Sequence, residues 1–179
     1  MTEDKSIVSK RRVTDYGEVL TGKREVNAML DLVKQETERI ESRFLEPACG
    51  NGNYLTAILE RKLTVVEKRY GKSLLDFERY GVLAVSSLYG IDILEDNVRQ
   101  CRQRLFNIFD SNFYSRLFAT SAKEQCREVV RFILERNIVW GDALDLKTKN
   151  EPRRPLVSSC SSRILTRGST RSSSVSTEP

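Results

Sequence analysis

The sequence contains no histidine, and it has few cysteines, prolines and tryptophans: 4, 4 and 1 among 179 residues. Without histidine, nucleophile schemes that pair serine or cysteine with histidine are excluded, and a zinc site is disfavoured. The cysteines show no C-x-x-C spacing and lie at Cys49, Cys101, Cys126 and Cys160. We therefore expect reduced structural thiols, with no disulfide framework and no metal.

Long apolar runs are also missing. No stretch approaches the roughly 20 apolar residues of a membrane span, and the first five residues, M-T-E-D-K, lack the apolar centre of a signal peptide. We expect a cytoplasmic protein without a membrane partner. The length suits one domain.

The net charge of +5 is concentrated near the C-terminus. Residues 151–179 carry five arginines against two glutamates, a net of +3, which leaves +2 for the preceding 150 residues. Charge alone therefore does not argue for a nucleic-acid surface. The same 29 residues hold nine serines and three prolines without an apolar period, which predicts a disordered tail over 150–179. A natural Arg/Ser tail and a shifted reading frame or truncation both account for it, and we favour the second.

The most informative segment is Phe44–Leu55, with the sequence F-L-E-P-A-C-G-N-G-N-Y-L. A short apolar run ends at Glu46, Gly50 and Gly52 follow, and a helix-like apolar pattern begins at Tyr54. This order of strand, glycine turn and helix is typical of loops whose backbone passes close to a nucleotide-like ligand. A G-x-G pair on its own also occurs in plain turns. The dinucleotide fingerprint is not met, because it requires a third glycine.

Apolar periodicity predicts the other elements. We expect helices near 24–41, 53–69, 73–86, from 96 onward and 121–136, and strands at 44–45, 88–93 and 137–140. Because strands alternate with helices, the pattern predicts an α/β fold with a mostly parallel sheet and helices on its faces. The polar and charged residues 1–16 are expected to form a flexible arm.

Acidic residues end all three predicted strands: Glu46, Asp92 and Asp142. Parallel strands place their carboxyl ends at one edge of the sheet, where ligands of open α/β sheets bind. A carboxylate there accepts hydrogen bonds from paired hydroxyls or from an amino group. Together with the G-x-G turn, and without a G-K-[ST] motif, the three acids indicate a nucleoside site with no fixed phosphate. Any one acid alone is as readily a helix cap or a solvated turn.

Four motifs in order across residues 17–144 resemble the N-terminal half of S-adenosylmethionine-dependent DNA adenine-N6 methyltransferases of the restriction–modification type. The family motif G-E-[VFY]-[FYL]-T-P resembles Gly17–Thr21, with Gly22 in place of proline. The motif L-E-P-A-C-G-x-G-x-[FY]-L matches Leu45–Leu55 in full. Ser87–Ile93 and Ile138–Leu144 resemble the family's second and third strands.

The resemblance implies a partial Rossmann-like class I methyltransferase fold over 17–149 that binds S-adenosyl-L-methionine. It assigns Thr21 to the methionine end, Asp92 to the ribose hydroxyls and Asp142 to the adenine amino group. The full set that it assigns to the cofactor is Thr21, Glu46, Pro47, Ala48, Cys49, Gly50, Gly52, Asn53, Asp92, Ile93, Asp142 and Ala143. Gly22 weakens the assignment of Thr21, because proline would pre-set that turn.

The family's adenine-binding Asn/Asp-Pro-Pro-Tyr/Phe segment occurs nowhere in the 179 residues. We therefore expect a cofactor-binding fragment that has no catalytic residues and is inactive on its own. The resemblance implies that full-length members of the family act on DNA. It also implies a restriction or specificity subunit as a further partner. One alternative is a non-catalytic cofactor-binding or partner-docking module completed by a second chain. Another is a nicotinamide-dependent oxidoreductase, which the missing third glycine disfavours.

Overall fold

The computed structural model describes residues 21–145 and 147–149. The arm expected over 1–16, the motif residues 17–20 and the tail expected over 150–179 lie outside the described residues. The elements are α2 (Lys23–Leu32), α3 (Lys34–Thr37), β1 (Phe44–Glu46), α4 (Asn53–Tyr70), α5 (Leu74–Ser86), β2 (Leu88–Asp92), α6 (Glu95–Asn107), η1 (Ile108–Tyr114), α7 (Ser115–Phe118), η2 (Ala119–Ser121), α8 (Glu124–Asn137), β3 (Ile138–Asp142) and β4 (Lys147–Thr148).

The predicted α/β sheet is confirmed. Its strand order is β1-β2-β3-β4, with β1, β2 and β3 parallel and β4 antiparallel to β3. All three predicted strands are present. The two-residue strand β4 was not predicted, because two residues are too few to show an alternating pattern.

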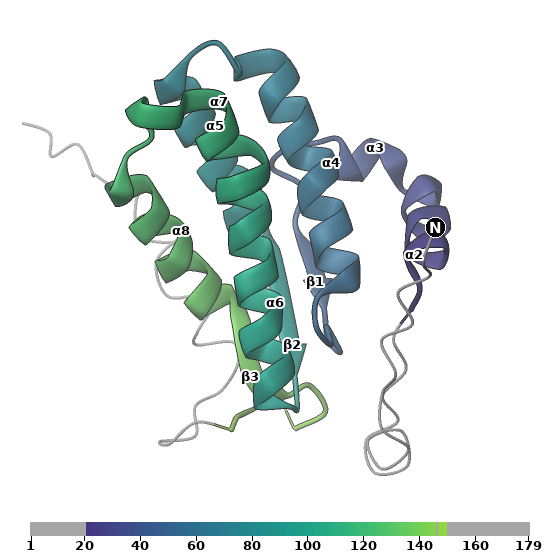
Figure 1. Ribbon diagram of the computed structural model, residues 1–179. Helices are drawn as coiled ribbons and strands as arrows, with labels where there is room; N and C mark the ends of the chain where they lie inside the picture. Colours follow the sequence, from purple (N-terminus) through teal and green to yellow (C-terminus); the bar gives the residue numbers. More distant parts are fainter. Residues whose placement is uncertain (1–20, 146, 150–179) are drawn as a thin grey trace, which may run out of the picture.

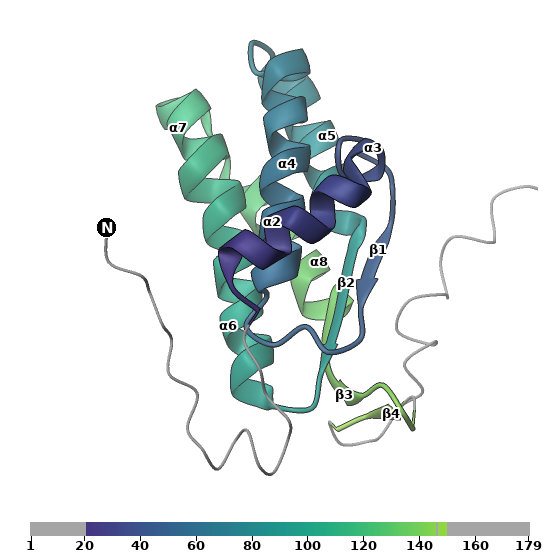
Figure 2. The ribbon, with the colours of Figure 1, turned by 90° about the vertical axis from the view of Figure 1, so that its right-hand side faces the viewer.

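Helices cover one face of the sheet, where α4 and α6 lie (Figures 1 and 2). Each crossover advances in the same direction, from β1 to β2 and from β2 to β3, and right-handed crossovers of this kind place their helices on the same side. The helices α5 and α8 lead almost directly into β2 and β3 and lie beyond the amino ends of these strands (Figure 1). The expected mostly parallel sheet with flanking helices is therefore present, and in the part of the chain that the structure describes these helices lie on one of its two faces.

Residues alternate between the two faces of the strands. Phe44, Leu88 and Ile138 face the helices and belong to the main core, where Leu88 and Ile138 are fully buried. On the opposite face Ile91 and Val139 form a small separate cluster. The sheet is thus the boundary between a large core and a smaller apolar surface.

The helix α4 supplies the centre of the core, as its apolar period predicted. Its fully buried apolar residues recur at helical spacing and are Leu55, Ile58, Leu59, Leu63 and Val66. Lys62 lies on the same buried side and is also fully buried. Its ammonium donates to the carbonyls of Ile40 (3.1 Å) and Ser42 and to the Ser87 hydroxyl (2.6 Å). This one side chain therefore fastens the segment before β1 to the start of β2.

The helix predicted over 24–41 is two helices, because Val33 leaves the helical region (φ −118°, ψ 31°). After the break, Thr37 and Ile40 are buried, whereas Met29 and Val33 are exposed by 51% and 42%. The apolar period that predicted this helix places Met29, Val33 and Ile40 on one stripe and does not include Thr37. Which of these residues are buried depends on packing against α4, and helical spacing alone does not determine this.

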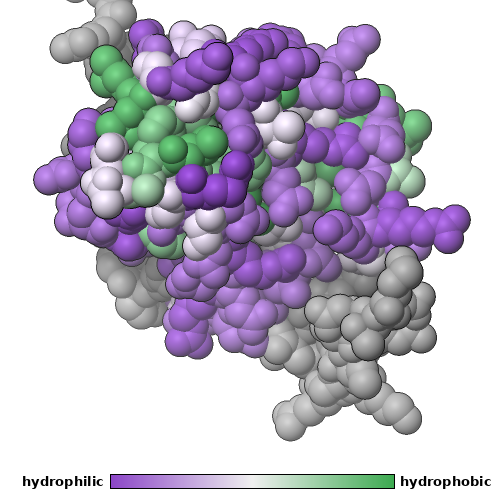
Figure 3. All heavy atoms as spheres, turned by 45° about the horizontal axis from the view of Figure 1, so that its top comes forward, coloured by the Kyte–Doolittle hydropathy of each residue, from purple (hydrophilic) through white to green (hydrophobic). Residues whose placement is uncertain are grey.

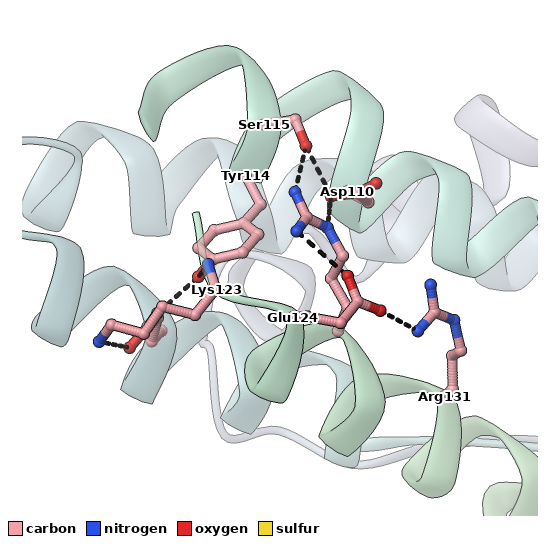
Figure 4. A network of polar contacts seen from close by, with 8 residues as sticks. Asp110, Tyr114, Ser115, Lys123, Glu124 and Arg131 are labelled. Atoms are coloured by element: carbon pink, nitrogen blue, oxygen red, sulfur yellow. Dashed lines mark hydrogen bonds and ion pairs between the residues drawn. The ribbon is translucent and has the colours of Figure 1, made fainter. Parts of the chain in front are cut away.

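The end of the molecule away from the carboxyl edge of the sheet is built from α5, η1, α7 and α8. Tyr114 is fully buried there; its hydroxyl donates to Glu78 and accepts from the backbone N–H of Lys123 at 2.8 Å (Figure 4). Arg127 of α8 donates to Asp110 at 2.8 Å. Seen from this end, the surface is mostly hydrophilic, with apolar residues in limited regions (Figure 3). Among the described helices, none is long and apolar enough to span a bilayer.

Candidate functional site

The three strand-end acids lie at one edge of the sheet, as predicted. The register pairs Glu46 with Gly90 and Asp92 with Trp140. Asp92 is therefore two residues beyond the partner of Glu46, and Asp142 is two residues beyond the partner of Asp92. Because both offsets are even, all three side chains start from the helix-covered face. With strands about 4.8 Å apart and about 3.3 Å of rise per residue, successive acids are separated by about 8 Å between Cα atoms.

The glycine loop, residues 47–52, connects β1 to α4 and crosses the end of β2. The N–H of Cys49 donates to the Ile91 carbonyl at 2.9 Å, and the N–H of Gly50 donates to the Asp92 carboxylate at 2.8 Å. Gly50 and Gly52 have φ angles of 52° and 90°, a region that side-chain-bearing residues rarely adopt. The loop is thus fixed to the acid at the centre of the edge.

Asp92 is 8% exposed and accepts three hydrogen bonds, two of them from backbone N–H groups. One carboxylate oxygen accepts from Gly50, and the other accepts from the Leu94 N–H at 2.9 Å and from the Asn97 amide at 3.3 Å. Each carboxylate oxygen has two acceptor positions. The described contacts leave one position, on the oxygen that faces the loop, for a further donor. Asp92 therefore organises the loop in addition to any contact with a ligand.

Glu46 has the least compensated carboxylate of the three. It is partly buried, and its described contact is a 3.4 Å hydrogen bond from the N–H of Ala48. Burial raises the pKa of Glu46 more than this hydrogen bond lowers it. A carboxylate in this environment is stabilised by any donor or cation that approaches it. Pro47 and Ala48 are exposed beside it.

The third acid, Asp142, lies at the end of β3, where one carboxylate oxygen accepts from the Leu144 N–H at 2.9 Å. The end of β3 is joined to β2 by the Trp140 indole, which donates to the Ile93 carbonyl at 3.0 Å. Ile93 is 41% exposed at this edge. Ala143 instead packs against the cluster of Ile91 and Val139. Of the predicted residues at the end of β3, Asp142 thus lies at the edge, whereas Ala143 contributes to packing.

Two loop residues have packing roles that the sequence did not reveal. A Cβ at Gly52 would lie 2.6 Å from the Cys101 sulfur on α6, so glycine is required by this helix whatever the ligand. Cys49 is buried beneath the loop, and its hydrogen bond with Cys101, together with burial, raises the pKa of its thiol. We therefore expect Cys49 to be protonated and unreactive.

The predicted residues Thr21 and Asn53 are in contact. The Asn53 amide nitrogen donates to the Thr21 carbonyl at 3.0 Å, and the amide oxygen accepts from Arg104 at 2.8 Å. Arg104 was not predicted, because it lies in the middle of α6 in no recognisable motif. Asn51 was also missed: its side-chain oxygen is buried without a hydrogen-bond partner among the described residues. A buried acceptor in this state is costly until a donor reaches it.

Comparison with known proteins adds no further constraint: no protein-family model, no curated protein and no solved structure matches the chain. Within the described residues, no group of three or more acidic or cysteine side chains could hold a metal ion. The geometry of the edge therefore carries the functional assignment.

Proposed function

We propose that the chain binds S-adenosyl-L-methionine along the carboxyl edge of β1, β2 and β3, as the cofactor-binding half of a DNA adenine-N6 methyltransferase of the restriction–modification type. The fold that this implies is a partial Rossmann-like class I methyltransferase domain over residues 17–149. The single observation that carries the proposal is the order of the three acids along the edge.

The order of the acids matches the order of the donors on the cofactor. S-adenosylmethionine has an amino-acid ammonium at one end, two ribose hydroxyls in the middle and an adenine amino group at the other end. Glu46, Asp92 and Asp142 follow one another across adjacent strands. We assign Glu46 to the ammonium end, Asp92 to a ribose hydroxyl and Asp142 to the adenine amino group.

The chemistry of these groups fits the proposed cofactor. The partly buried Glu46 favours a cationic donor, because burial raises its pKa and few contacts compensate it. The free acceptor position of Asp92 suits one hydroxyl rather than two. Ile93, exposed by 41%, offers an apolar side chain to a flat base. A donor on the bound molecule that reached Asn51 would also satisfy its buried oxygen.

When bound, S-adenosylmethionine supplies a methyl group on a sulfonium, which needs no metal and no covalent enzyme intermediate. The residues of this chain would bind and orient it, and orientation is the main contribution that such a transfer requires. The family segment that holds the extruded adenine is absent from the 179 residues. We therefore expect the isolated chain to bind the cofactor and to transfer no methyl group to DNA.

Isothermal titration with S-adenosylhomocysteine tests the proposal. We expect one site per chain, and about tenfold weaker binding in Asp142→Ala, since a lost hydrogen bond to a charged acceptor costs about 1.5 kcal/mol. Asp145→Ala is the matched control, because it removes a nearby exposed acid that does not end a strand. Absence of binding by the wild type, or binding of reduced nicotinamide dinucleotide in its place, would overturn the proposal.

A second candidate function is a module that a second chain completes. It is favoured by the sheet face that no described helix covers and by Leu45 of the edge strand β1, which is 64% exposed (Figure 2). Binding of S-adenosylhomocysteine that appears only in a purified complex with a second subunit would support this reading. Binding by the isolated chain would show that no second subunit is needed for the site.

A further inference from the structure

We infer that Arg104 is a positioning residue for the proposed cofactor site, acting through Asn53 on the glycine loop and on Thr21. This inference rests on the proposed function. It adds a residue of α6 that no sequence motif assigns and that does not need to touch the bound molecule.

The contacts of Arg104 are directed at the turn around Gly52. One guanidinium nitrogen, Nη1, donates to the Asn51 carbonyl at 2.8 Å and to the Asn53 side-chain oxygen at 2.8 Å. These two acceptors precede and follow Gly52, whose φ is 90°. A single charged nitrogen therefore closes the turn from both sides.

The same contact fixes the orientation of the Asn53 amide. Because its oxygen faces Arg104, its nitrogen faces the Thr21 carbonyl, to which it donates at 3.0 Å. Asn53 is also the first residue of α4. A chain of hydrogen bonds thus runs from α6 through the start of α4 to the segment that precedes α2.

Ordering this turn is the physical benefit. Glycine loops lose much conformational freedom when they become ordered, and a loop that is already ordered does not incur this cost when a ligand binds. Arg104 would therefore act on affinity by pre-organising the loop, and charged hydrogen bonds are strong enough to do so.

The first test compares three variants by titration with S-adenosylhomocysteine and by thermal unfolding. We expect Arg104→Met to bind about tenfold more weakly, and Arg104→Lys to recover part of the loss, because one lysine nitrogen can donate to both acceptors. Arg99→Met is the matched control: it removes an exposed arginine from the same helix and should leave the affinity unchanged. Equal affinities for Arg104→Met, Arg99→Met and the wild type would overturn the inference. A fall in melting temperature without a change in affinity would also overturn it.

The second test separates the contact between Arg104 and Asn53 from the contact between Asn53 and Thr21. Asn53→Asp keeps an acceptor for Arg104 but loses the donor to Thr21. Amide hydrogen exchange of the free protein should then stay slow at Gly52 and become faster in the segment that begins at Thr21. In Arg104→Met both regions should exchange faster, and unchanged exchange at Gly52 would contradict the inference. Because this readout uses no ligand, it remains informative if the wild type fails to bind S-adenosylhomocysteine, a result that would refute only the proposed function.

Discussion

At the scale of single residues, Asp92 connects three parts of the chain. Its carboxylate joins the glycine loop at Gly50, the turn at Leu94 and the helix α6 at Asn97. Its position at the strand end was predicted from the sequence. Its use as a backbone acceptor was not, because these donors are set by the fold of the loop rather than by any local pattern.

We predict that Asp92→Asn weakens both folding and binding. An amide nitrogen cannot accept, so either the Gly50 or the Leu94 N–H loses its partner, at a cost of about 1–3 kcal/mol in the free energy of unfolding. Urea denaturation measures this loss, and titration with S-adenosylhomocysteine should show at least tenfold weaker binding. Asp145→Asn should change neither quantity. Unaltered stability of Asp92→Asn would contradict the described hydrogen bonds.

Gly52→Ala should be destabilising for two separable reasons. The added Cβ would lie 2.6 Å from the Cys101 sulfur, and alanine would have to adopt a φ of 90°. We expect a loss of roughly 1–3 kcal/mol from the backbone strain, with a further loss from the contact. The double variant Gly52→Ala, Cys101→Ala should recover only the steric part. Complete recovery in a denaturation experiment would mean that the backbone angle carries no cost.

The buried Lys62 predicts a pH dependence of stability. Burial lowers its pKa from an ordinary 10.5 to about 8. Its three acceptors match the three N–H groups of the ammonium form, so we expect Lys62 to be charged at neutral pH. Between pH 8 and 10.5 the unfolded chain binds more protons at this group than the folded chain does. The contribution of Lys62 to stability therefore rises with pH in this interval, by at most about 3 kcal/mol.

Comparison with Lys62→Met isolates the contribution of Lys62. Other groups titrate in the same pH interval, but they are present in both proteins and cancel in the difference. The free energy of unfolding of the wild type, minus that of Lys62→Met, should increase from pH 7.5 to 10. A difference that does not vary with pH would show that burial does not lower this pKa.

At the scale of elements, the sequence predicted those whose signals are local. The apolar period predicted the α4 helix and a helix near 73–86, and the structure has α5 there, with Ser73 as its cap accepting from the Asp76 N–H at 3.3 Å. The break at Val33 and the π-helical turn η1 were not predicted, because no local pattern marks them; Thr37 after the break and Tyr114 at the end of η1 are both buried in the structure. Likewise, the acids of the candidate site were predictable because each one ends a strand. Arg104 was not predictable, because it contacts Asn53, which is 51 residues away in the sequence.

Tyr114→Phe tests the independence of the two ends of the molecule. It removes the hydroxyl that joins Glu78 of α5 to the Lys123 N–H (Figure 4). Both hydrogen bonds are partly buried, and Glu78 keeps its ion pair with the Lys123 ammonium at 3.3 Å, so their loss should lower the free energy of unfolding by about 1 kcal/mol. Because the network lies at the other end of α6–η1–α7 from the glycine loop (Figure 1), affinity for S-adenosylhomocysteine should not change. A parallel loss of affinity would show that the two ends are coupled.

At the scale of the whole molecule, the strand order determines both the layers and the site. Strands added in one direction, β1 to β2 to β3, leave the helices on one face and bring every strand-end acid to one edge. The parallel sheet and this edge were predictable from the alternation of strands and helices. The uncovered face was not, because alternation does not specify the direction in which strands are added.

The most direct test of the binding site is a titration of the isotopically labelled protein with S-adenosylhomocysteine, followed by backbone amide NMR. We expect saturable shifts at Gly50 and Gly52 of the loop and at Asp92 and Asp142 of the sheet edge, with no shift around Tyr114. Resonances that do not move at any concentration, or that move only at the end of the molecule that contains Tyr114, would contradict it.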